Sequence, residues 1–370
     1  MRYRRAYLEV SLSAIVHNLR QYRQEIPEHA AMMAVVKADG YGHGAIPVLK
    51  KAIEAGVTWA GVALIEEAIE LRNAGIEIPI LLLGSWFPEA LPAFSQYGIT
   101  PVVHSLDSAQ GLQDYAKRQN LRIKIHIKLD TGMGRLGFCE KSLVEFLTHF
   151  SNYDHLIIDG VMTHFSSADE GVESFSQEQV RKFNQALSLV KRWHHPTWIH
   201  LANTAGITEV SGTRGNLFRV GIGMYGQPPS ACLVNPVQLR EAITWKAGII
   251  QLQQHPAHVP LSYGRTFYTQ RPSQIATVCV GYADGYSRRL SNEFYALVRG
   301  QKVPIVGNVC MDMFLLDVTN VPGVEVNDEV ILIGQQQGLS ITASEMAEQL
   351  QTINYEITCR ISKRIPRIYT

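Results

Sequence analysis

Alternating strand-like and helical segments fill the first part of this chain and restrict its possible folds more than any other feature. Eight short apolar runs lie near residues 32–36, 59–64, 79–83, 99–103, 122–129, 156–163, 197–201 and 217–222, and helical patterns lie near 45–55, 65–74, 87–97, 107–118, 141–150, 174–193 and 204–210. Strands that alternate with helices pair in parallel, because each helix returns the chain to the starting edge of the sheet. Eight such units predict a (β/α)8 barrel of the TIM type. No GxGxxG motif follows the first strand, which weighs against an open doubly wound sheet.

The sequence changes character near residue 236, where short β-like runs replace the alternation. Runs at 277–280, 296–298, 303–306, 314–318 and 330–333 are separated by Gly, Asn or Pro turns, and only 342–350 has a clear helical pattern. We therefore predict an α/β chain of two domains, a (β/α)8 barrel over residues 1–235 and a mostly β C-terminal domain over 236–370. The strand-like segment 6–12 precedes the barrel pattern and is a candidate to pack with the C-terminal domain.

Composition and charge exclude several classes of function. The 370 residues carry a net charge of +1, so the chain lacks the basic surface expected of a protein that binds nucleic acid or an anionic membrane. It contains no apolar run long enough to span a membrane, and no apolar signal-peptide segment follows Met1–Arg5. The five cysteines are scattered without a CxxC pair, which indicates neither a disulfide framework nor a metal site. The reducing cytoplasm is the expected location.

Polar residues gather where the predicted barrel strands end, and in barrels of this type the active site lies at the C-terminal ends of the strands. Lys37 closes the first apolar run, and the later ends carry Tyr41, Asp130, Arg135, His164, Asn203, Thr204, Arg219 and Gly221–Gly223. Most lysines are solvated in loops. A lysine at a strand end has two other fates: it pairs with an anion, or it loses its charge and acts as a nucleophile or base.

The glycine-rich turn at 220–226 follows the last predicted strand. Barrels often bind phosphate at this place through backbone N–H groups. Thr204, at the start of a predicted short helix, adds a hydroxyl and helix N-terminal amides. A phosphate site beside a reactive lysine suits covalently attached pyridoxal 5′-phosphate, which is the predicted cofactor.

Motifs along nearly the whole chain resemble those of alanine racemases. In the barrel they are Val36–Gly44, Lys128–Gly137, Thr163–Phe165, Ala202–Thr204 and Arg219–Ile222, and in the β domain they are Ser262–Gly264, Gly281–Gly285, Cys310–Asp312 and Ile353–Glu356. The resemblance implies a barrel followed by a β domain in a head-to-tail homodimer. It also implies an isomerase that interconverts L-alanine and D-alanine with pyridoxal phosphate. Such an enzyme supplies D-alanine for cell-wall peptidoglycan or catabolises alanine.

The resemblance assigns roles to individual residues. Lys37 would hold the cofactor and act as the base on the D-alanine side, and Tyr263 of the other subunit would be the base on the L-alanine side. Arg135 and the Met311 N–H would bind the substrate carboxylate. The other cofactor contacts would be Tyr41, His164, Asn203, Thr204, Arg219, Gly221, Ile222 and Tyr355, and the substrate corridor would include Asp169, Tyr282, Arg288 and Asp312. Lys128 matches a position that is carbamylated in many family members.

Three places depart from the family pattern, although none is a proposed base. This chain has Asp39-Gly40 where the family more usually has Asn-Ala, Thr204 where serine is common, and Asn308 where the corridor often carries arginine. Three other functions compete: a broader-specificity racemase, a barrel-type decarboxylase and a non-catalytic pyridoxal-phosphate protein. Broad-specificity racemases are typically exported, the Tyr263 and Met311 motifs weigh against a decarboxylase, and the second domain weighs against a non-catalytic carrier.

Overall fold

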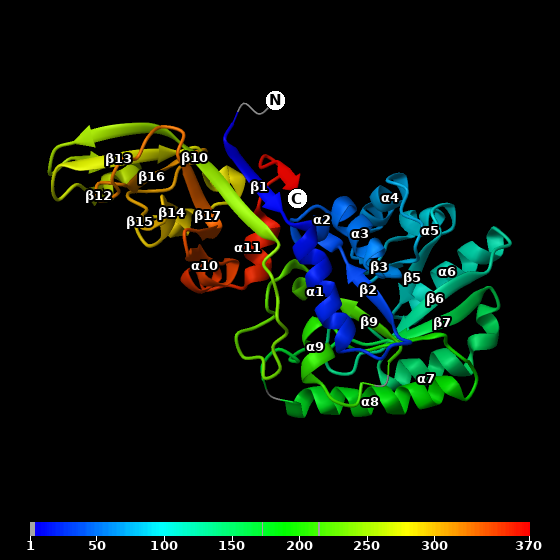
Figure 1. Ribbon diagram of the computed structural model, residues 1–370. Coiled ribbons are helices and arrows are strands. Elements are labelled where there is room, and N and C mark those ends of the chain that lie inside the picture. Colours follow the sequence, from blue (N-terminus) through cyan, green and yellow to red (C-terminus); the bar gives the residue numbers. More distant parts are fainter. Residues whose placement is uncertain (1–3, 172, 214) are drawn as a thin grey trace. The chain divides into compact units, whose positions relative to one another are not determined.

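The computed structural model describes residues 4–171, 173–213 and 215–370, so the first three residues of the N-terminal segment considered above lie outside it. The chain forms two compact units (Figure 1). The barrel unit comprises Ile15–Gly40 and Ala45–Arg240, and the β-rich unit comprises residues 4–14, Tyr41–Gly44 and Glu241–Thr370. The segment that begins at Lys37 therefore contributes to both units.

Eight parallel strands form the centre of the barrel unit, in the hydrogen-bonded order β8-β7-β6-β5-β4-β3-β2-β9. The ring is nearly closed between the two outer strands, where the Asn216 N–H donates to Ile199 O at 2.9 Å and the Arg219 N–H donates to Ala202 O at 3.3 Å. The predicted fold class, a TIM-type barrel followed by a mostly β part, is confirmed. The strands are β2 (Ala31–Val35), β3 (Trp59–Val62), β4 (Ile80–Leu82), β5 (Ile99–Val103), β6 (Ile123–Lys128), β7 (Leu156–Met162), β8 (Trp198–His200) and β9 (Leu217–Val220).

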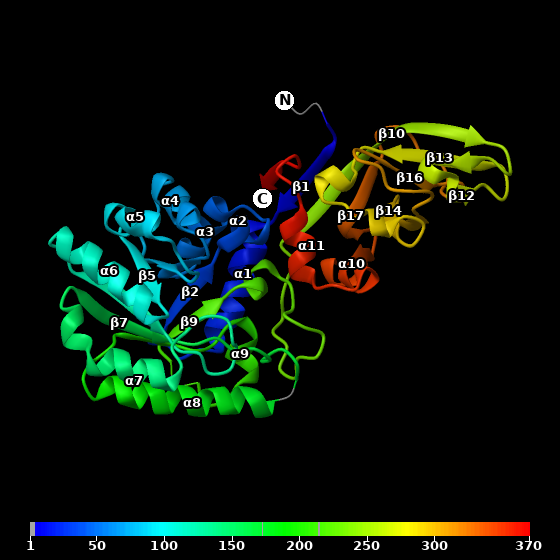
Figure 2. The ribbon, with the colours of Figure 1, turned by 180° about the vertical axis from the view of Figure 1, so that it is seen from behind.

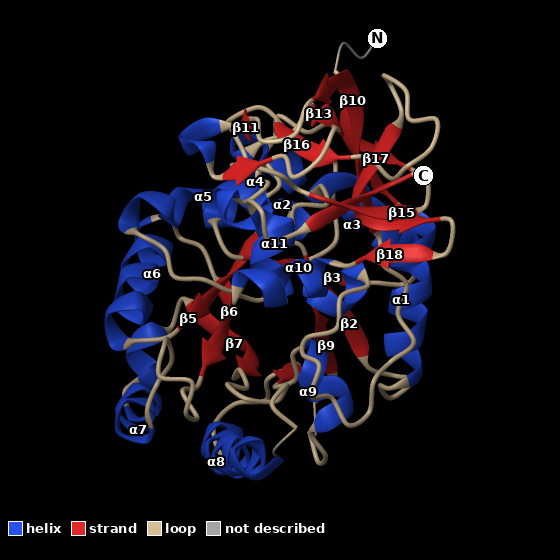
Figure 3. Cartoon of the chain, turned by 90° about the vertical axis from the view of Figure 1, so that its left-hand side faces the viewer, coloured by secondary structure: helices blue, strands red, loops and turns tan. Residues whose placement is uncertain are grey.

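Helices lie outside these strands (Figures 2 and 3). They are α1 (Leu12–Gln24), α3 (Ala45–Glu54), α4 (Ile65–Asn73), α5 (Leu91–Gln96), α6 (Leu106–Arg118), α7 (Glu140–Thr148), α8 (Glu173–Lys191) and α9 (Thr204–Glu209), with 3₁₀ turns at Pro88–Ala90, Phe150–Tyr153 and Ile222–Tyr225. Side chains from six strands fill the barrel interior as one buried cluster: Met33, Trp59, Leu81, Val102, Met162 and Leu217. The interior is therefore a packed core, and ligands are confined to the strand ends.

Helix α6 shows how local sequence sets these boundaries. Ser105 caps it, because its Oγ accepts the Ser108 N–H at 3.1 Å. Ala109, Leu112 and Ala116 then recur at helical spacing and are buried. Among the described residues, no helix has both the length and the apolar character needed to cross a membrane.

The β-rich unit is built on a mostly antiparallel sheet with the order β15-β14-β17-β10-β1-β19, joined by β13 on β10, β16 on β13 and β18 on β17. Strand β1 pairs antiparallel with β10 and parallel with β19. The strands are β1 (Ala6–Val10), β10 (Ile243–His255), β11 (Pro260–Leu261), β12 (Phe267–Tyr268), β13 (Ser273–Val278), β14 (Tyr295–Val298), β15 (Gln301–Pro304), β16 (Phe314–Asp317), β17 (Glu329–Gln336), β18 (Leu339–Ile341) and β19 (Arg367–Tyr369). Further 3₁₀ turns span Tyr263–Arg265, Tyr282–Asp284 and Arg288–Leu290.

Two features of this unit differ from the sequence-based expectation. Helix α10 (Ala343–Leu350) begins as predicted, with Thr342 Oγ1 accepting the Glu345 N–H at 3.0 Å, but a second helix, α11 (Asn354–Arg360), follows it. Ile353 precedes α11 and provides no side-chain cap, so the usual start signal is absent. Strand β10 was not among the predicted runs either, and the residues of its second half are glutamine-rich and largely exposed, so they lack an apolar run.

Candidate active site

Lys37 begins a tight left-handed turn, labelled α2 (Lys37–Tyr41), just after strand β2. The φ angles of Ala38, Asp39 and Tyr41 are +53°, +51° and +53°, a region that residues with a Cβ rarely adopt. The Glu67 carboxylate supports the turn, because its Oε1 accepts the Ala38 N–H at 2.6 Å while Oε2 accepts two amides at the start of α4. The turn therefore fixes Lys37 at the C-terminal end of its strand.

Arg219, in β9, is buried and surrounded by hydrogen-bond acceptors. Its Nη1 donates to His200 Nδ1 at 3.0 Å, and its Nη2 donates to Thr163 O at 3.0 Å and Leu201 O at 2.8 Å. The same Nη2 lies 3.2 Å from His164 Nδ1, so the structure brings the predicted pair Arg219 and His164 together. Burial lowers the pKa of Arg219 to about 10, and the guanidinium therefore stays charged at neutral pH.

Two buried histidines extend this network into the barrel. His200 Nε2 lies 2.9 Å from His126 Nδ1. Because an arginine only donates, His200 Nδ1 must accept, and its proton lies on Nε2, which donates to His126. Burial and the Arg219 charge hold the pKa values of His200 and His164 well below the ordinary value, and burial lowers the pKa of His126 to about 4. Neutral imidazoles therefore orient the Arg219 guanidinium.

A cluster of cations lies at the end of β6. Lys128 is the last residue of this strand, and Asp130 Oδ1 accepts two N–H groups of the following loop, each at 3.0 Å, which shapes the loop that carries Arg135. Burial, then the charges of Arg135, Arg219 and Lys37, lower the pKa of Lys128 to about 8, and Asp130 opposes them. Three cationic side chains thus act on Lys128 at the strand ends, and one carboxylate offsets part of their effect.

The turn after β9 is tied to its neighbours on both sides. Asn203 Oδ1 accepts a backbone N–H of the first turn of α9 at 2.9 Å. Thr204 Oγ1 accepts the Gly221 N–H at 2.8 Å, which joins α9 to this turn. The buried Tyr225 hydroxyl donates to Val35 O at 3.0 Å, at the end of β2. These bonds position two short helical starts beside the strand that leads to Lys37.

The donor set fits the predicted cofactor. Lys37, Lys128, Arg135 and Arg219 supply positive charge, and the helical turns that begin at Thr204 and Ile222 follow the C-terminal ends of β8 and β9. Such a set favours an anionic, phosphorylated ligand. A lysine at the same mouth meets the further requirement of pyridoxal phosphate for an amine.

The other predicted site residues lie in the β-rich unit, apart from Asp169, which is half-buried in the loop after β7. The rings of Tyr41 and Tyr355 have centroids 6.0 Å apart, so these two predicted phosphate contacts are neighbours. The side chains of Tyr263 and Met311 are 73% and 53% exposed.

Backbone bonds join the segments that carry the corridor residues. The Tyr282 N–H donates to Cys310 O at 3.0 Å, which brings Tyr282 beside the Met311 segment. Asp312 accepts a hydrogen bond from Arg364 at 2.6 Å. Arg288 begins a separate 3₁₀ turn.

Four supporting residues were not identified from the sequence, and one of them is His126, which lies within β6. His200 ends β8 and was available to the same strand-end argument that selected Arg219. Tyr225 lies in the glycine-rich turn, but its bond to Val35 joins residues far apart in the chain. Glu67 gave no signal, because an acidic residue in the first turn of a helix is ordinary.

The chain forms a parallel barrel and a separate β-rich unit. The barrel has a lysine after its first strand and a phosphate-type turn after its last strand. This is the architecture of a barrel-type pyridoxal-phosphate enzyme. The family model "Alanine racemase, N-terminal domain" matches residues 10–229, and "Alanine racemase, C-terminal domain" matches residues 242–369. The chain belongs to the alanine racemase family.

Individual relatives are similar over almost their whole length. The "Alanine racemase" of Halothermothrix orenii is 43% identical over 99% of this chain and 97% of its own. The crystal structure of alanine racemase from Bacillus anthracis with bound L-Ala-P superposes with a TM-score of 0.95 at 38% identity and covers 100% of this chain and 96% of its own. That from Bartonella henselae with covalently bound pyridoxal phosphate has a TM-score of 0.90 at 30% identity, covering 99% of each chain.

Proposed function

We propose that this chain is a pyridoxal-phosphate-dependent isomerase that interconverts L-alanine and D-alanine by two bases, Lys37 and Tyr263. Family membership, which rests on matches to residues 10–229 and 242–369, supports the reaction. The observation that carries the site assignment is the convergence of Lys37, Arg219 and the Thr204–Gly221 contact at the strand ends. When bound, pyridoxal phosphate supplies an electron-withdrawing ring that acidifies the Cα–H of an attached amino acid.

The barrel residues divide the work of binding. Lys37 would hold the cofactor, and the amides and hydroxyl around Thr204, Gly221 and Ile222 would hold its phosphate together with Tyr41 and Tyr355. Arg219 would face the ring nitrogen with His164 beside it. Because a guanidinium only donates hydrogen bonds, it keeps a neighbouring ring nitrogen unprotonated.

Proton transfer requires one group on each face of Cα. The Lys37 amine would remove or return the proton on the D-alanine side, and the Tyr263 hydroxyl would do so on the L-alanine side. Arg135 and the Met311 N–H would bind the substrate carboxylate and keep Cα between the two bases. Asp169, Tyr282, Arg288 and Asp312 would line the route by which alanine arrives.

We further propose that each active site combines Lys37 of one subunit with Tyr263 and Met311 of a second copy in a homodimer. Tyr263 and Met311 are 73% and 53% exposed, so they do not pack in the core of their own unit, and this supports a contact with the second copy. Asn308 Nδ2 donates to Tyr263 O at 2.7 Å, and Ser262 Oγ donates to Asn308 O at 2.6 Å, so the exposed tyrosine stands on a fixed loop.

In the cell, we propose that the enzyme acts in the cytoplasm and supplies D-alanine for peptidoglycan. Growth of a bacterium that requires D-alanine, restored by this chain without added D-alanine, is the expected result. A Lys37→Ala chain that restores growth equally well would contradict it.

The reaction itself is tested with cofactor-loaded protein and L-alanine in deuterium oxide. The expected products are D-alanine and L-alanine that both carry deuterium at Cα, separated by chiral chromatography and weighed by mass spectrometry. Release of carbon dioxide would indicate a decarboxylase, absence of exchange would indicate a non-catalytic protein, and equal turnover of serine would indicate broader specificity.

A further inference from the structure

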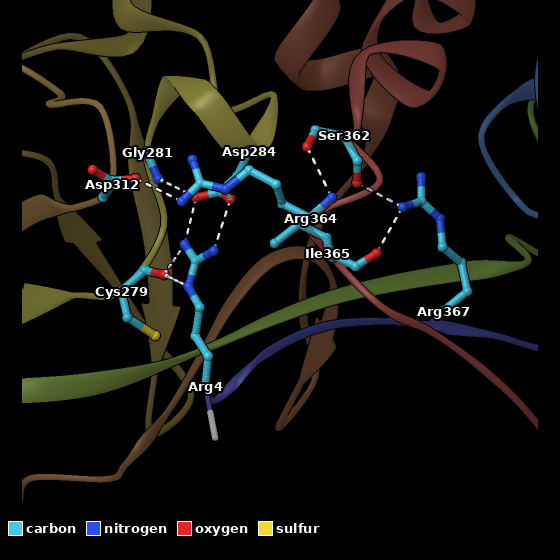
Figure 4. Close-up of polar contacts among 9 residues, drawn as sticks. All are labelled: Arg4, Cys279, Gly281, Asp284, Asp312, Ser362, Arg364, Ile365 and Arg367. Atoms are coloured by element: carbon cyan, nitrogen blue, oxygen red, sulfur yellow. Dashed lines mark hydrogen bonds and ion pairs between the residues drawn. The ribbon is translucent and has the colours of Figure 1, made fainter. Parts of the chain in front are cut away.

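Asp284 has a fully buried carboxylate in the 3₁₀ turn Tyr282–Asp284, and Figure 4 shows its surroundings. A carboxylate removed from water is stable only when several donors satisfy it. Arg4 Nη1 donates to Oδ1 at 2.8 Å, and Arg4 Nη2 donates to Oδ2. The Gly281 N–H donates to Oδ2 at 3.0 Å, and Arg364 Nε lies 3.6 Å from Oδ1.

Arg4 is itself fixed in place. Besides the bidentate contact of Arg4 with Asp284, the Arg4 Nε donates to Cys279 O at 2.8 Å. The hydrogen bond to Asp284 raises the pKa of Arg4 above its ordinary value. A planar guanidinium that meets a carboxylate with two parallel bonds sets both position and orientation, which a lysine cannot do.

The Asp284 turn and the Met311 segment are in direct backbone contact. The Tyr282 N–H donates to Cys310 O and the Ala283 N–H donates to Met311 O, each at 3.0 Å. A Cβ on Gly281 would collide with the carbonyls of this segment, so the approach requires glycine. A displacement of the Asp284 turn would therefore also displace the Met311 backbone.

Side chains make a second connection between the same segments. Arg364 Nη2 donates to Asp312 Oδ1 at 2.6 Å, while its Nε faces Asp284 (Figure 4). Charges alternate along the row Arg4, Asp284, Arg364 and Asp312. The Asp284 end is buried and the Asp312 end is half exposed, so the first pair is strong and the last is weak.

We propose that Asp284 and Arg4 are positioning residues that hold the Tyr282 turn and the Met311 segment in the geometry that binds the substrate carboxylate. The proposal rests on the proposed function of Met311. Without Arg4, the buried Asp284 keeps Arg364 as a cationic neighbour, and the exposed side chain of Arg364 then moves toward it and releases Asp312. A change at residue 4 thus alters a segment more than three hundred positions away in the sequence.

Arg4→Met in the cofactor-loaded protein is the first test. The KM for alanine should rise by about tenfold, the size expected for one lost charge-assisted contact, while kcat changes by less than about threefold. Arg4→Lys should recover part of the loss, because it restores the charge without the second bond. Arg5→Met is the matched control, because the neighbouring Arg5 is exposed and its guanidinium donates to the Asn327 carbonyl at 3.1 Å.

Hydrogen exchange of the Tyr282 and Ala283 amides gives a readout that does not depend on activity. Their exchange should become about tenfold faster in Arg4→Met and stay unchanged in Arg5→Met. The Arg4→Met and Asp312→Asn changes should also be non-additive in KM, because both act through Arg364.

Each result of these measurements either supports or contradicts the positioning role of Arg4 and Asp284. Faster exchange with a raised KM supports the positioning role. An unchanged KM with only a lower melting temperature, a raised KM with unchanged exchange, or an equal effect of Arg5→Met would overturn it. If Arg4→Met does not fold, an Arg4→Lys protein with wild-type KM and exchange overturns it as well. If the wild-type chain does not racemise alanine, yet Arg4→Met speeds exchange, the proposed function fails and the anchoring of the turn stands.

Discussion

The surroundings of Lys128 make its amine reactive toward carbon dioxide near neutral pH. Burial and the nearby cations lower its pKa from 10.5 to about 8. At a pH of about 7.5, about a quarter of such amines are neutral, compared with about 0.1% for an ordinary lysine. Only the neutral amine adds to carbon dioxide, forming a carbamate and releasing one proton. We therefore predict that Lys128 is carbamylated in the active protein.

Carbamylation would convert a positive charge beside Arg135 into a negative one. The carbamate would accept two hydrogen bonds from the Arg135 guanidinium in a bidentate pair and so orient this guanidinium for the substrate carboxylate. Without the carbamate, Lys128 and Arg135 repel each other, as the lowered pKa of Lys128 reflects. Lys128→Arg cannot form a carbamate and should lower kcat/KM roughly ten- to hundredfold, the effect of losing one hydrogen bond between charged groups.

Carbon-13 NMR with labelled bicarbonate measures the modification directly. A carbamate signal should be present in the wild-type protein and absent in Lys128→Arg. Lys124→Ala serves as the control, because Lys124 lies on the same strand but is exposed and paired with Asp159 at 3.4 Å. Absence of the signal from the wild type, or activity that is indifferent to both the substitution and removal of carbon dioxide, would refute the argument.

Three further outcomes follow from the barrel. Gly223→Ala should cost about 1–3 kcal/mol in thermal unfolding, because its Cβ would collide with the buried Tyr22 ring. Glu67→Gln leaves one backbone donor without its acceptor at the Lys37 turn and should cost about 1–3 kcal/mol and lower kcat/KM of the loaded enzyme. The pKa of His126 is lowered from 6.5 to about 4, so below pH 6.5 the unfolded chain binds a proton that the folded chain does not. The free energy of unfolding, measured in urea, should therefore fall as the pH drops through this window, by up to about 3 kcal/mol from His126.

Controls separate these effects from general damage. Gly111→Ala, in the interior of α6, meets only Trp86 at 3.7 Å and should be neutral or stabilising by about 1 kcal/mol. Equal destabilisation by Gly111→Ala and Gly223→Ala would contradict the packing argument. Glu66→Gln, in the same helical turn, should leave kcat/KM unchanged. A free energy of unfolding that stays flat between pH 6.5 and 4 would contradict the neutral state of His126.

The sequence predicted the barrel because its strands and helices have local signatures. Eight apolar runs each became a strand, and the polar residue that ended a run, as Lys37 and His164 do, came to the strand-end face. Parallel pairing makes this inference possible without knowledge of contacts. The same logic would have selected His200, which also ends a strand.

Other parts of the site depend on contacts that no local pattern encodes. Glu67 supports a turn 29 positions before it in the chain, and Arg4 reaches Asp284 across 280 positions. An arginine near the N-terminus and an aspartate in a short turn have many possible partners, and only the folded chain selects one. Helix α11 was missed for a related reason, since it begins without a side-chain cap.

Subunit complementation tests the central claim, that Lys37 of one copy acts with Tyr263 of another. Lys37→Ala and Tyr263→Phe proteins should each show little or no racemisation of alanine. After the two are mixed, unfolded and refolded together, each mixed dimer would contain one site with both bases, so activity should recover to about a quarter of the wild-type value. No recovery, in a mixture shown by mass spectrometry to contain mixed dimers, would contradict a shared two-base site.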